Sequence, residues 1–429
     1  MGLACFGVHY TAVAACECYQ TVAVSCKRQA LNMIEFLLML ALLPITLPAA
    51  SLLVLTLAAL RPARADDAAP AVADSPALRV AVLVPAHNES VNLIPTIECL
   101  QRQLGAQDRL LVVADNCSDD TAEVARRAGA LVVERHDAEL RGKGYALAFG
   151  VEQLRADPPD VVLVVDADCT VSDGAVACIA QRCQSTGKPM QMLYLLSAGS
   201  KPGLKLRVLQ FAMLMKNLVR PLGALRLGGA CHLMGTGMAI PWRLRSSAKL
   251  ATGHITEDMK LGIEMAMVGA APQFLPDLLV SSVFPLDTDA AKVQKTRWEH
   301  GHLATLTEDL PGLLLSALKT RNPALIVMAM DLLIPPVAFY FLLLFGVLAV
   351  LVVATVFWPV WALAAWLLAI AALCFGLAIG LAWFRYGRDL LSARELLSTP
   401  LYALWKLPIY VAYLLKKRSG WVRTKRDSE

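Results

Sequence analysis

Residues 161–168 read VVLVVDAD, a run of five apolar residues that ends in two aspartates one residue apart. Such a Val-rich run is typical of a strand that is buried on both faces, as the strands of a parallel sheet are. Ligands of open parallel sheets bind at the carboxyl ends of the strands. The two aspartates therefore mark the edge of the sheet where we expect the chemistry to take place.

The sequence around this run alternates between short apolar runs and segments with helical spacing. Strands that alternate with helices indicate right-handed βαβ units, and hence an α/β fold with a mostly parallel sheet. The predicted strands are 79–84, 109–113, 131–133 and 161–165, and the predicted helices are 90–104, 121–128 and 143–155.

The composition indicates a membrane protein that also has a water-exposed domain. Of the 429 residues, 57% are hydrophobic and 17% are charged, whereas soluble proteins carry roughly 25% charged residues. The 35 acidic and 40 basic residues are nevertheless too many for an all-helical membrane bundle, in which charge is costly. These figures exclude a plain cytosolic enzyme, a disordered chain and a small disulfide scaffold.

Three apolar blocks are long enough to cross a bilayer. Residues 36–60 carry no charge over 25 positions, and 337–357 and 359–384 are similarly apolar. At ~1.5 Å rise per residue, each spans the roughly 30 Å of the hydrocarbon core. The alternative for the first block is a cleaved signal peptide. The block 36–60 is too long for a signal peptide and is interrupted by prolines at 44 and 48, which favours a retained span instead.

These features divide the chain into seven segments. Met33 is a candidate for the natural start, because the segment that it opens resembles a membrane anchor. The stretch 323–336 contains Asp331 and two adjacent prolines, which favours interfacial helices there. The segments are an N-terminal extension (1–32), a transmembrane helix (33–61), a linker (62–78), a strand-and-helix domain (79–310), interfacial helices (311–336), two transmembrane helices (337–384), and an interfacial segment with a basic cytoplasmic tail (385–429).

Charge and cysteine usage set the expected location. The stretch 416–426 holds six Lys or Arg and no acid, which is typical of a cytoplasmic anchor that faces anionic membrane lipid. Two spans after the domain return the chain to the side on which the domain lies. The 11 cysteines form no C-x-x-C pair, which favours a reducing compartment. We therefore expect a multi-pass protein of the cell inner membrane, with a cytoplasmic domain and no nucleic-acid partner.

Polar residues follow the predicted strands: VPAHNE at 84–89, DNCSDDT at 115–121 and DAD at 166–168. Two like charges ~4 Å apart cost about 4 kcal/mol at an effective dielectric near 20, so such carboxylates need a cation between them. Asp166 and Asp168 can hold Mg²⁺ or Mn²⁺, with the remaining ligands supplied by water and a diphosphate. For D-x-D alone, the alternative is an acidic turn that caps a strand.

Two further motifs, TED at 256–258 and QKTRW at 294–298, complete a pattern. Together with the strand-end motifs, they resemble glycosyltransferase family 2, whose members are inverting enzymes with a GT-A fold. The resemblance extends to its membrane-embedded branch, which includes cellulose, chitin, hyaluronan and poly-N-acetylglucosamine synthases. It covers roughly 79–310, with Q-x-x-R-W after T-E-D as its most specific part. Ala114 departs from the family pattern, because it replaces the first acid of D-D-G-S-x-D-x-T.

The resemblance implies a donor site for a nucleotide sugar. The matching family aspartate accepts the N–H of uracil, so Asp115 favours a UDP-sugar, although Ala114 leaves the base less certain. Lys143, in RGKG at 141–144, resembles the family's K-G motif and can place a point charge on a phosphate. The alternative for this tetrapeptide is a basic surface loop. The expected donor-binding residues are Pro85, Ala86, Asn88, Glu89, Asp115, Lys143 and Asp166.

The remaining motifs imply catalytic and acceptor roles. Asp258 is the candidate general base, and Glu257 either orients it or caps a helix at 256–268. Arg297 can neutralise the leaving diphosphate and Trp298 can stack on a sugar. The alternative for these two is a Trp at the membrane interface beside a snorkelling Arg. The expected catalytic residues are Asp258, Glu257, Arg297, Trp298 and Gln294, and the expected acceptor residues are Gly235, Thr236, Gly237 and Trp298.

Two of these assignments have a plainer alternative. The stretch Gly235 to Gly237 is equally compatible with an ordinary turn. His300 and His302 lie beside Glu299 and suggest a metal site, but three close ligands without a partner cluster favour an interfacial loop instead.

The leading hypothesis is therefore a metal-dependent hexosyl- or N-acetylhexosaminyltransferase of exopolysaccharide or cell-surface glycan synthesis. The few predicted spans leave open whether it extends a polysaccharide, adds one sugar to a polyprenyl-linked acceptor, or needs a partner subunit. One alternative is a non-catalytic membrane scaffold with a degenerate transferase domain. Another is a sugar nucleotidyltransferase, but 85–89 lacks the Gly-rich loop that such an enzyme needs.

Overall fold

The computed structural model describes residues 35–62, 78–197, 202–247, 250–284 and 288–405, and the isolated residues 29, 33, 199 and 407. Side chains of 288–295 are not part of this description. The N-terminal extension, most of the linker 62–78 and the basic tail therefore lie outside the described residues.

The described chain contains an eight-stranded sheet, and this confirms the predicted α/β fold. The strand order is β3-β2-β1-β4-β7-β6-β8-β5. The strands are β1 (Val80–Ala86), β2 (Arg109–Asp115), β3 (Leu131–Arg135), β4 (Val161–Val164), β5 (Thr170–Val171), β6 (Met190–Ser197), β7 (Met238–Pro241) and β8 (Gln273–Val283).

The sheet is mixed rather than uniformly parallel. From β3 through β2 and β1 to β4 all neighbours are parallel, as the alternation of strands and helices predicted. Strand β7 then runs antiparallel to β4 and to β6, β8 pairs parallel with β6, and β5 pairs antiparallel with β8. The uniformly parallel prediction therefore holds for β3, β2, β1 and β4, and it fails where β7 and β5 enter the sheet in the opposite direction.

Strand β1 extends two residues beyond its predicted end, through Pro85 to Ala86. A proline lacks an N–H group, but this matters least near the end of a strand, where fewer ladder bonds are made. Pro85 keeps its register opposite Val113 of β2. The strand therefore carries the first motif directly to the edge of the sheet.

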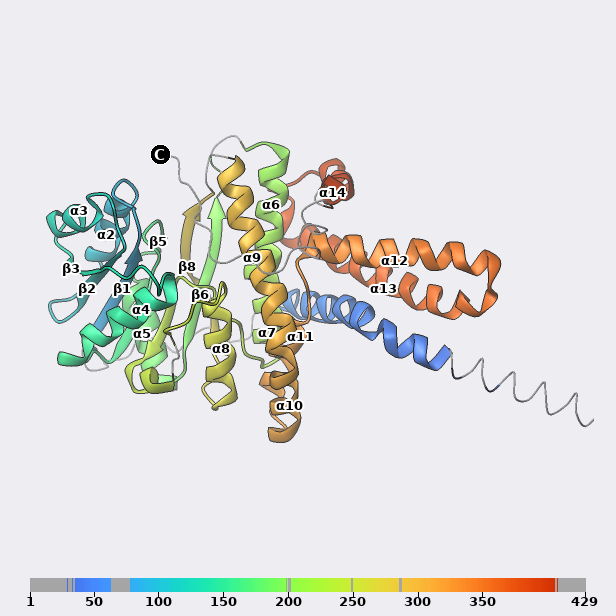
Figure 1. The fold of residues 1–429 in the computed structure, drawn as a ribbon, viewed down its shortest axis with the longest axis horizontal. Coiled ribbons are helices and arrows are strands. Elements are labelled where there is room, and N and C mark those ends of the chain that lie inside the picture. The colour runs from blue at the N-terminus through green and yellow to red at the C-terminus, as the bar shows by residue number, and fades with distance from the viewer. Residues whose placement is uncertain are drawn as a thin grey trace, which may run out of the picture.

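The predicted helices are present with somewhat different ends; the segment predicted at 90–104 forms a helix over Leu93–Gln101. Figure 1 shows these helices on the two faces of the sheet. The helices of this part are α2 (Leu93–Gln101), α3 (Thr121–Arg127), α4 (Lys143–Gln153), α5 (Ala175–Thr186), α6 (Leu204–Leu214), α7 (Arg220–Arg226) and α8 (Glu257–Met267), with a π-helical turn, η3 (Met215–Val219), between α6 and α7.

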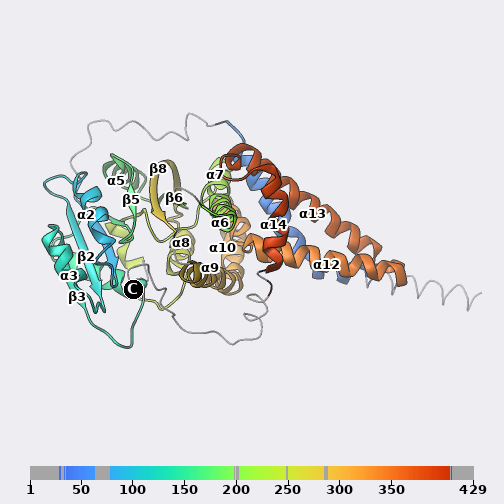
Figure 2. The same ribbon diagram turned by 90° about the horizontal axis from the view of Figure 1, so that it is seen from above.

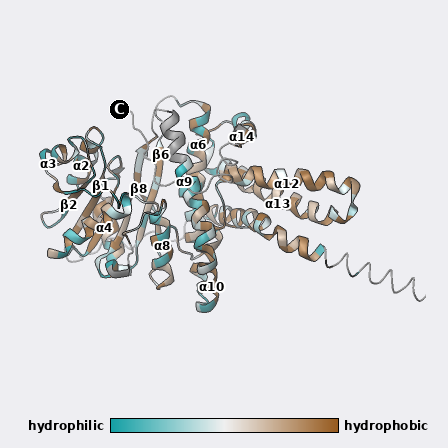
Figure 3. Cartoon of the chain, viewed as in Figure 1, coloured by the Kyte–Doolittle hydropathy of each residue, from teal (hydrophilic) through white to brown (hydrophobic). Residues whose placement is uncertain are grey.

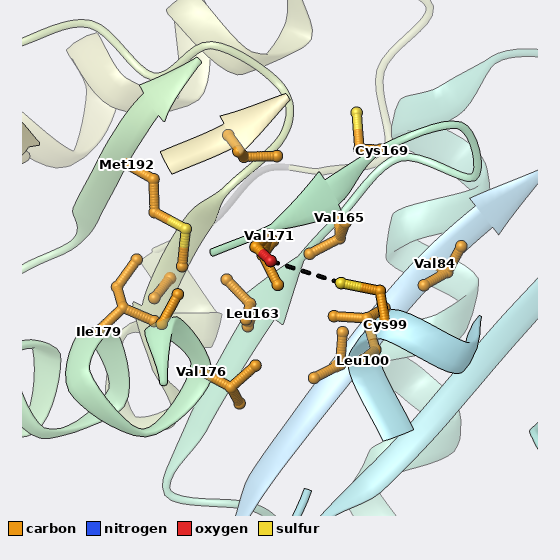
Figure 4. Packing of buried hydrophobic residues seen from close by; sticks show 14 of the residues in the cluster. Val84, Cys99, Leu100, Leu163, Val165, Cys169, Val171, Val176, Ile179 and Met192 are labelled. Carbon is orange, nitrogen blue, oxygen red and sulfur yellow. Dashed lines mark hydrogen bonds between the residues drawn. The ribbon is translucent and has the colours of Figure 1, made fainter. Parts of the chain in front are cut away.

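Both faces of the sheet are buried. Along β1, Val82 and Val84 belong to one apolar cluster, while Leu83 belongs to another on the opposite face. Figure 4 shows part of the first cluster, in which Leu100 of α2 and Ile179 of α5 approach the strands. This double burial explains why the strands read as continuous apolar runs.

Three helices are long and apolar enough to cross a membrane, by length and composition: Glu35–Ala59, Val337–Phe357 (α12) and Pro359–Gly387, which includes α13 (Ala362–Ala382). Figures 1 and 2 show all three extending away from the sheet on the same side. In Figure 3 these helices are coloured mostly as hydrophobic residues. The Tyr340 hydroxyl of α12 donates to the carbonyl of Ile45 at 2.5 Å. This bond joins the hairpin formed by α12 and α13 to the N-terminal helix Glu35–Ala59.

Four more helices follow the sheet or end the described chain: α9 (Thr288–Glu308), α10 (Leu310–Thr320), α11 (Pro323–Leu332) and α14 (Ala393–Trp405). The prediction of a loop around His300 and His302 is wrong, because both lie within α9, and His302 is buried. The apolar residues of α9 do not line one side of the helix. The sequence therefore lacks the helical periodicity that would predict a helix here.

Helix α7 joins the sheet to the apolar helix Glu35–Ala59 near the N-terminus and to α11. Arg220 donates from Nε to Oδ1 of Asp331 in α11 at 2.6 Å, and both side chains are buried. On the same helix, Gly223 lies against the backbone of Leu55, because a Cβ placed there would be 2.1 Å from the Leu55 carbonyl oxygen. The N-terminal helix therefore packs on α7 at a distance that a glycine permits.

We expect Gly223→Ala to lower the melting temperature of the detergent-solubilised protein substantially. The added side chain must displace the N-terminal helix, and overpacking of this kind typically costs about 1–3 kcal/mol or more. Gly346→Ala in α12 is the matched control, because a Cβ there meets no atom within 4 Å. Equal melting temperatures for the two variants would contradict the close contact.

Candidate active site

A cleft of about 580 Å³ lies at the carboxyl ends of β1, β2 and β4. Its walls come from the loops after these strands, from the start of α4, from η3, from the start of α8 and from α9. The predicted site residues that line it are Pro85, Ala86, Asn88, Glu89, Asp115, Lys143, Asp166, Asp168, Gly235, Glu257, Asp258, Arg297 and Trp298.

The loops after β1 and β2 are bound to each other. Asn88 donates from Nδ2 to the Ser118 hydroxyl at 2.9 Å, and Ser118 returns a backbone N–H to Asn88 Oδ1 at 2.7 Å. Asn88 adopts a φ of 53°, a left-handed conformation that asparagine tolerates better than most residues. The backbone N–H of Glu89 donates to the hydroxyl of Thr121 at 2.8 Å. The two motifs therefore fix one wall of the cleft jointly.

Asp115 at the end of β2 is held by an arginine that sequence reasoning missed. Arg135, at the end of β3, donates from Nη1 to Asp115 Oδ1 at 2.6 Å, and each side chain is 9% exposed. Arg135 also binds the carboxylate of Asp137 and the carbonyl of Leu140. The signal was available, since an arginine ends the strand that neighbours β2 and a buried carboxylate needs a cation.

The D-x-D motif fits a hard divalent cation. Ligand atoms of Asp166, Asp168 and Cys169 lie within 4.8 Å of one another. Burial raises the pKa of the Cys169 thiol well above its ordinary value, so the two carboxylates are the donors that suit Mg²⁺ or Mn²⁺. Ser282 donates its hydroxyl to Asp168 Oδ2 at 3.2 Å, which orients that carboxylate.

Lys143 lies between the D-x-D motif and the predicted base. Its Nζ donates to Asp166 Oδ1 and to the Gly235 carbonyl, the latter at 2.9 Å. Burial by itself lowers the pKa of Lys143, but the negative charges of Asp166, Glu257 and Asp258 outweigh that effect and raise it. Lys143 therefore carries its charge at neutral pH.

Gly235 brings Lys143 and Asp258 close together. Its φ is +84°, and a Cβ at this position would lie 3.2 Å from both Asp258 Oδ2 and Lys143 Nζ. Thr236 and Gly237, expected beside the acceptor, do not line the cleft. The buried Thr236 hydroxyl instead accepts the backbone N–H of Asp166 at 3.1 Å. The loop therefore holds the backbone of Asp166 in place, and of its three residues only Gly235 lines the cleft.

Glu257 and Asp258 begin α8. Asp258 Oδ1 accepts the backbone N–H of Met259 at 2.8 Å, and a helix N-terminus favours negative charge. Burial nevertheless raises the pKa of Asp258, against the lowering effect of Lys216 and Lys143. Burial and the negative charge of Asp258 raise the pKa of Glu257 to about 7. Glu257 therefore gains a proton near neutral pH, beside a carboxyl group, that of Asp258, whose pKa is also raised.

Lys216 is a second cation in the cleft that sequence reasoning missed. It lies on the π-helical turn η3 and lines the cleft together with Asn217. Asn217 donates to the Tyr194 carbonyl of β6 at 3.0 Å, which fixes this turn against the sheet. A lysine within the apolar run 208–219 was the available signal, and π-helical turns occur frequently at functional sites.

Helix α9 contributes the Q-x-x-R-W residues. Arg297 and Trp298 line the cleft, and Trp298 also packs against the apolar cluster under the sheet. The side chain of Gln294 lies outside the described residues. The cleft therefore combines paired carboxylates, two lysines, two arginines (Arg141 and Arg297) and the aromatic rings of Tyr194 and Trp298.

Comparison with known proteins agrees with this geometry. A family model described as "Glycosyltransferase like family 2" matches residues 76–301, more than half of the chain. The chain therefore belongs to this family.

Two relatives match short stretches. The chain is 33% identical over 93 residues to the low-salt glycan biosynthesis hexosyltransferase Agl6 of Haloferax volcanii, and the match covers 21% of each chain. It is 33% identical over 106 residues to the probable glycosyltransferase YdaM of Bacillus subtilis, over 23% of this chain and 24% of that one. The matches thus span less than a quarter of either relative.

A solved structure shares the fold over a much longer range. The mannosyltransferase PcManGT from Pyrobaculum calidifontis, in complex with GDP-Man and Mn²⁺, superposes with a TM-score of 0.52 and 16% identity. The superposition covers 90% of this chain and all of that one. The predicted GT-A fold is therefore confirmed.

We expect Arg135→Met to destabilise the protein by about 3–5 kcal/mol, because it leaves Asp115 buried without its cation. Adding Asp115→Asn should recover part of this loss. Arg126→Met is the matched control, since the ion pair of Arg126 with Glu134 is half exposed and worth little. Thermal unfolding of the four proteins measures the difference. Similar losses for Arg126→Met and Arg135→Met would contradict the role of burial.

Proposed function

We propose that the protein is an inverting, metal-dependent glycosyltransferase that moves a hexosyl or N-acetylhexosaminyl group from a nucleotide-sugar donor to a glycan or polyprenyl-linked acceptor. The observation that carries this proposal is the arrangement of charge in the cleft. The D-x-D carboxylates and the carboxylate of Asp258 face one cavity but approach Lys143 from different elements. We therefore assign metal binding to Asp166 and Asp168 and the role of general base to Asp258.

In this reaction the acceptor oxygen forms a bond to the anomeric carbon while the bond from that carbon to the diphosphate breaks. Asp258 takes the proton of the acceptor hydroxyl. Asp166 and Asp168 would hold Mg²⁺ or Mn²⁺, which when bound supplies positive charge to the leaving diphosphate. Lys143 and Arg297 add positive charge on the protein's side, and Trp298 offers a face on which a sugar can stack.

The donor is proposed to be a UDP-sugar, with Asp115 and the wall formed by Asn88 and Glu89 around the base. Arg135 restrains the Asp115 carboxylate at the strand end, which supports a role in orienting a planar ligand. The GDP-Man and Mn²⁺ in the structure of PcManGT support a nucleotide sugar with a divalent metal in this fold. They also make GDP-sugars the first alternative donors to try.

We place this activity at the cytoplasmic face of the inner membrane, in exopolysaccharide or cell-surface glycan synthesis. The three long apolar helices support a multi-pass membrane protein. Leu314, Leu315 and Leu318 of α10 and Leu397 and Leu401 of α14 are exposed, which supports contact of these short helices with membrane lipid. A partner subunit is part of the proposal only if the acceptor is a growing polysaccharide.

The test is a transfer assay on membranes that contain the full-length protein. Labelled UDP- and GDP-sugars are supplied with Mg²⁺ or Mn²⁺, and the products are separated by size. A product with one added sugar indicates a single-addition transferase, and a ladder indicates a polymer synthase. Absence of both transfer and metal-dependent nucleotide binding would favour the membrane scaffold.

We expect Asp258→Asn to lower the transfer rate by about 10²–10⁴, the usual contribution of general-base catalysis. Because Asp258 does not touch the donor diphosphate in this mechanism, the affinity for UDP with Mn²⁺ should stay within a few-fold of wild type. Parallel assays of turnover and nucleotide binding separate the two effects. Retained transfer in the variant would sink the assignment of the base.

The rate should also fall on acidification, because burial raises the pKa of Asp258 and the base therefore gains a proton at a higher pH than an exposed aspartate would. The pKa of Glu257 is raised to about 7, so the neighbouring carboxylate also gains a proton as the pH falls through neutrality. Glu257→Gln removes one negative charge beside Asp258, which should move the acidic limb of the profile to lower pH. Loss of activity at every pH in Glu257→Gln would indicate instead that Glu257 is the base.

A further inference from the structure

The ammonium group of Lys143 binds one of the two carboxylates of the D-x-D motif. Its Nζ donates to Asp166 Oδ1, and Asp166 is one of the two carboxylates of the candidate metal site. A second bond, to the Gly235 carbonyl at 2.9 Å, holds the ammonium group in place. The lysine is therefore bonded directly to a candidate metal ligand.

A divalent cation and an ammonium group compete for such a carboxylate. Two cations that share one oxygen repel each other strongly in a partly buried site, where the effective dielectric is well below that of water. Asp166 and Lys143 expose only 31% and 25% of their side chains, so solvent screens this repulsion only in part. Either the metal binds weakly or the lysine leaves the carboxylate.

A bound donor would offer Lys143 a further anionic partner, in addition to the carboxylates of Asp166, Glu257 and Asp258 that already face it. Lys143 is the first residue of α4, an eleven-residue helix whose N-terminal N–H groups favour a phosphate. Gly142 before it has a φ of +129°, and a Cβ there would meet no atom within 4 Å. A diphosphate at this helix end would lie within reach of the flexible lysine side chain.

We infer that Lys143 is a resident counter-ion of Asp166 that keeps bare metal out of the site, and that it moves to the diphosphate when metal and donor bind together. The inference rests on the proposed function and adds to it a coupling between the binding of the metal and the binding of the donor. Without nucleotide, Lys143 neutralises the carboxylates that face it. With nucleotide, the diphosphate takes over the ammonium group and Asp166 is released to the metal. Metal and nucleotide then bind cooperatively.

The experiment measures Mn²⁺ binding rather than turnover. Full-length protein in detergent is titrated with Mn²⁺ alone and with Mn²⁺ plus UDP or GDP, and free Mn²⁺ is followed by electron paramagnetic resonance. In the wild type, the nucleotide should tighten Mn²⁺ binding. In Lys143→Met, Mn²⁺ alone should bind roughly tenfold tighter or more, because one positive charge has left the site. The same variant should bind the nucleotide with Mn²⁺ more weakly.

Two controls separate this contact from general electrostatics. Lys143→Arg keeps the charge and should leave the affinity for Mn²⁺ alone near that of wild type. Arg141→Gln removes another cation that lines the cleft but is exposed to solvent, so it should change that affinity far less than Lys143→Met does. Lys143→Gln replaces the Met variant if thermal unfolding shows that the Met variant is not folded.

The inference and the proposed function fail in different ways. If wild type binds UDP or GDP with Mn²⁺ but Lys143→Met binds Mn²⁺ alone no more tightly, the counter-ion role is overturned and the transferase proposal stands. If Arg141→Gln tightens Mn²⁺ binding as much as Lys143→Met, the specific contact is also overturned. If wild type binds neither nucleotide at any Mn²⁺ concentration, the proposed function fails.

Discussion

The repulsion among the carboxylates at one edge of the sheet is the constraint on which this structure depends. Asp166 follows β4, while Glu257 and Asp258 begin α8, and all three face Lys143. Negative groups gathered in a partly buried cleft raise one another's pKa values and cost folding free energy unless cations accompany them. Lys143 and Lys216 supply that charge from α4 and η3. The positions of α4 and η3 at the cleft place these two lysines near the carboxylates.

Much of the fold could be predicted because its signal is local. The Val-rich run of β4 and the alternation from β1 to α4 follow from burial on both faces and from the two periodicities of the backbone. The second half of the sheet could not be derived in this way. Nothing in the four residues of β7 tells whether the strand runs with or against β4, because direction depends on how longer segments return to the sheet. Likewise, α9 carries no one-sided pattern, so its histidines were placed in a loop.

The site shows the same division. Residues that act through their own chemistry at strand ends, such as Asp166, could be recognised from type and position. Arg135 and Lys216 escaped recognition because each is defined by a partner distant in sequence. A buried carboxylate implies a cation, but the sequence does not say which of the forty basic residues supplies it. Thr236, which the motif places beside the acceptor, is buried and accepts the backbone N–H of Asp166, a contact that the sequence does not predict.

The stretch from α6 to α7 links the cleft to the three long apolar helices, Glu35–Ala59, α12 and α13. Lys216 lines the cleft, while Met215 and Val219 on the same turn belong to the apolar cluster that contains Leu52 and Leu55 of the N-terminal helix. One turn later, Arg220 forms its buried pair with Asp331, just before the hairpin begins. Neighbouring residues of one short segment therefore face the cleft and the apolar helices. Because a buried ion pair is costly to break from one side, the pair of Arg220 with Asp331 holds α7 against α11, one turn away from the lysine that lines the cleft.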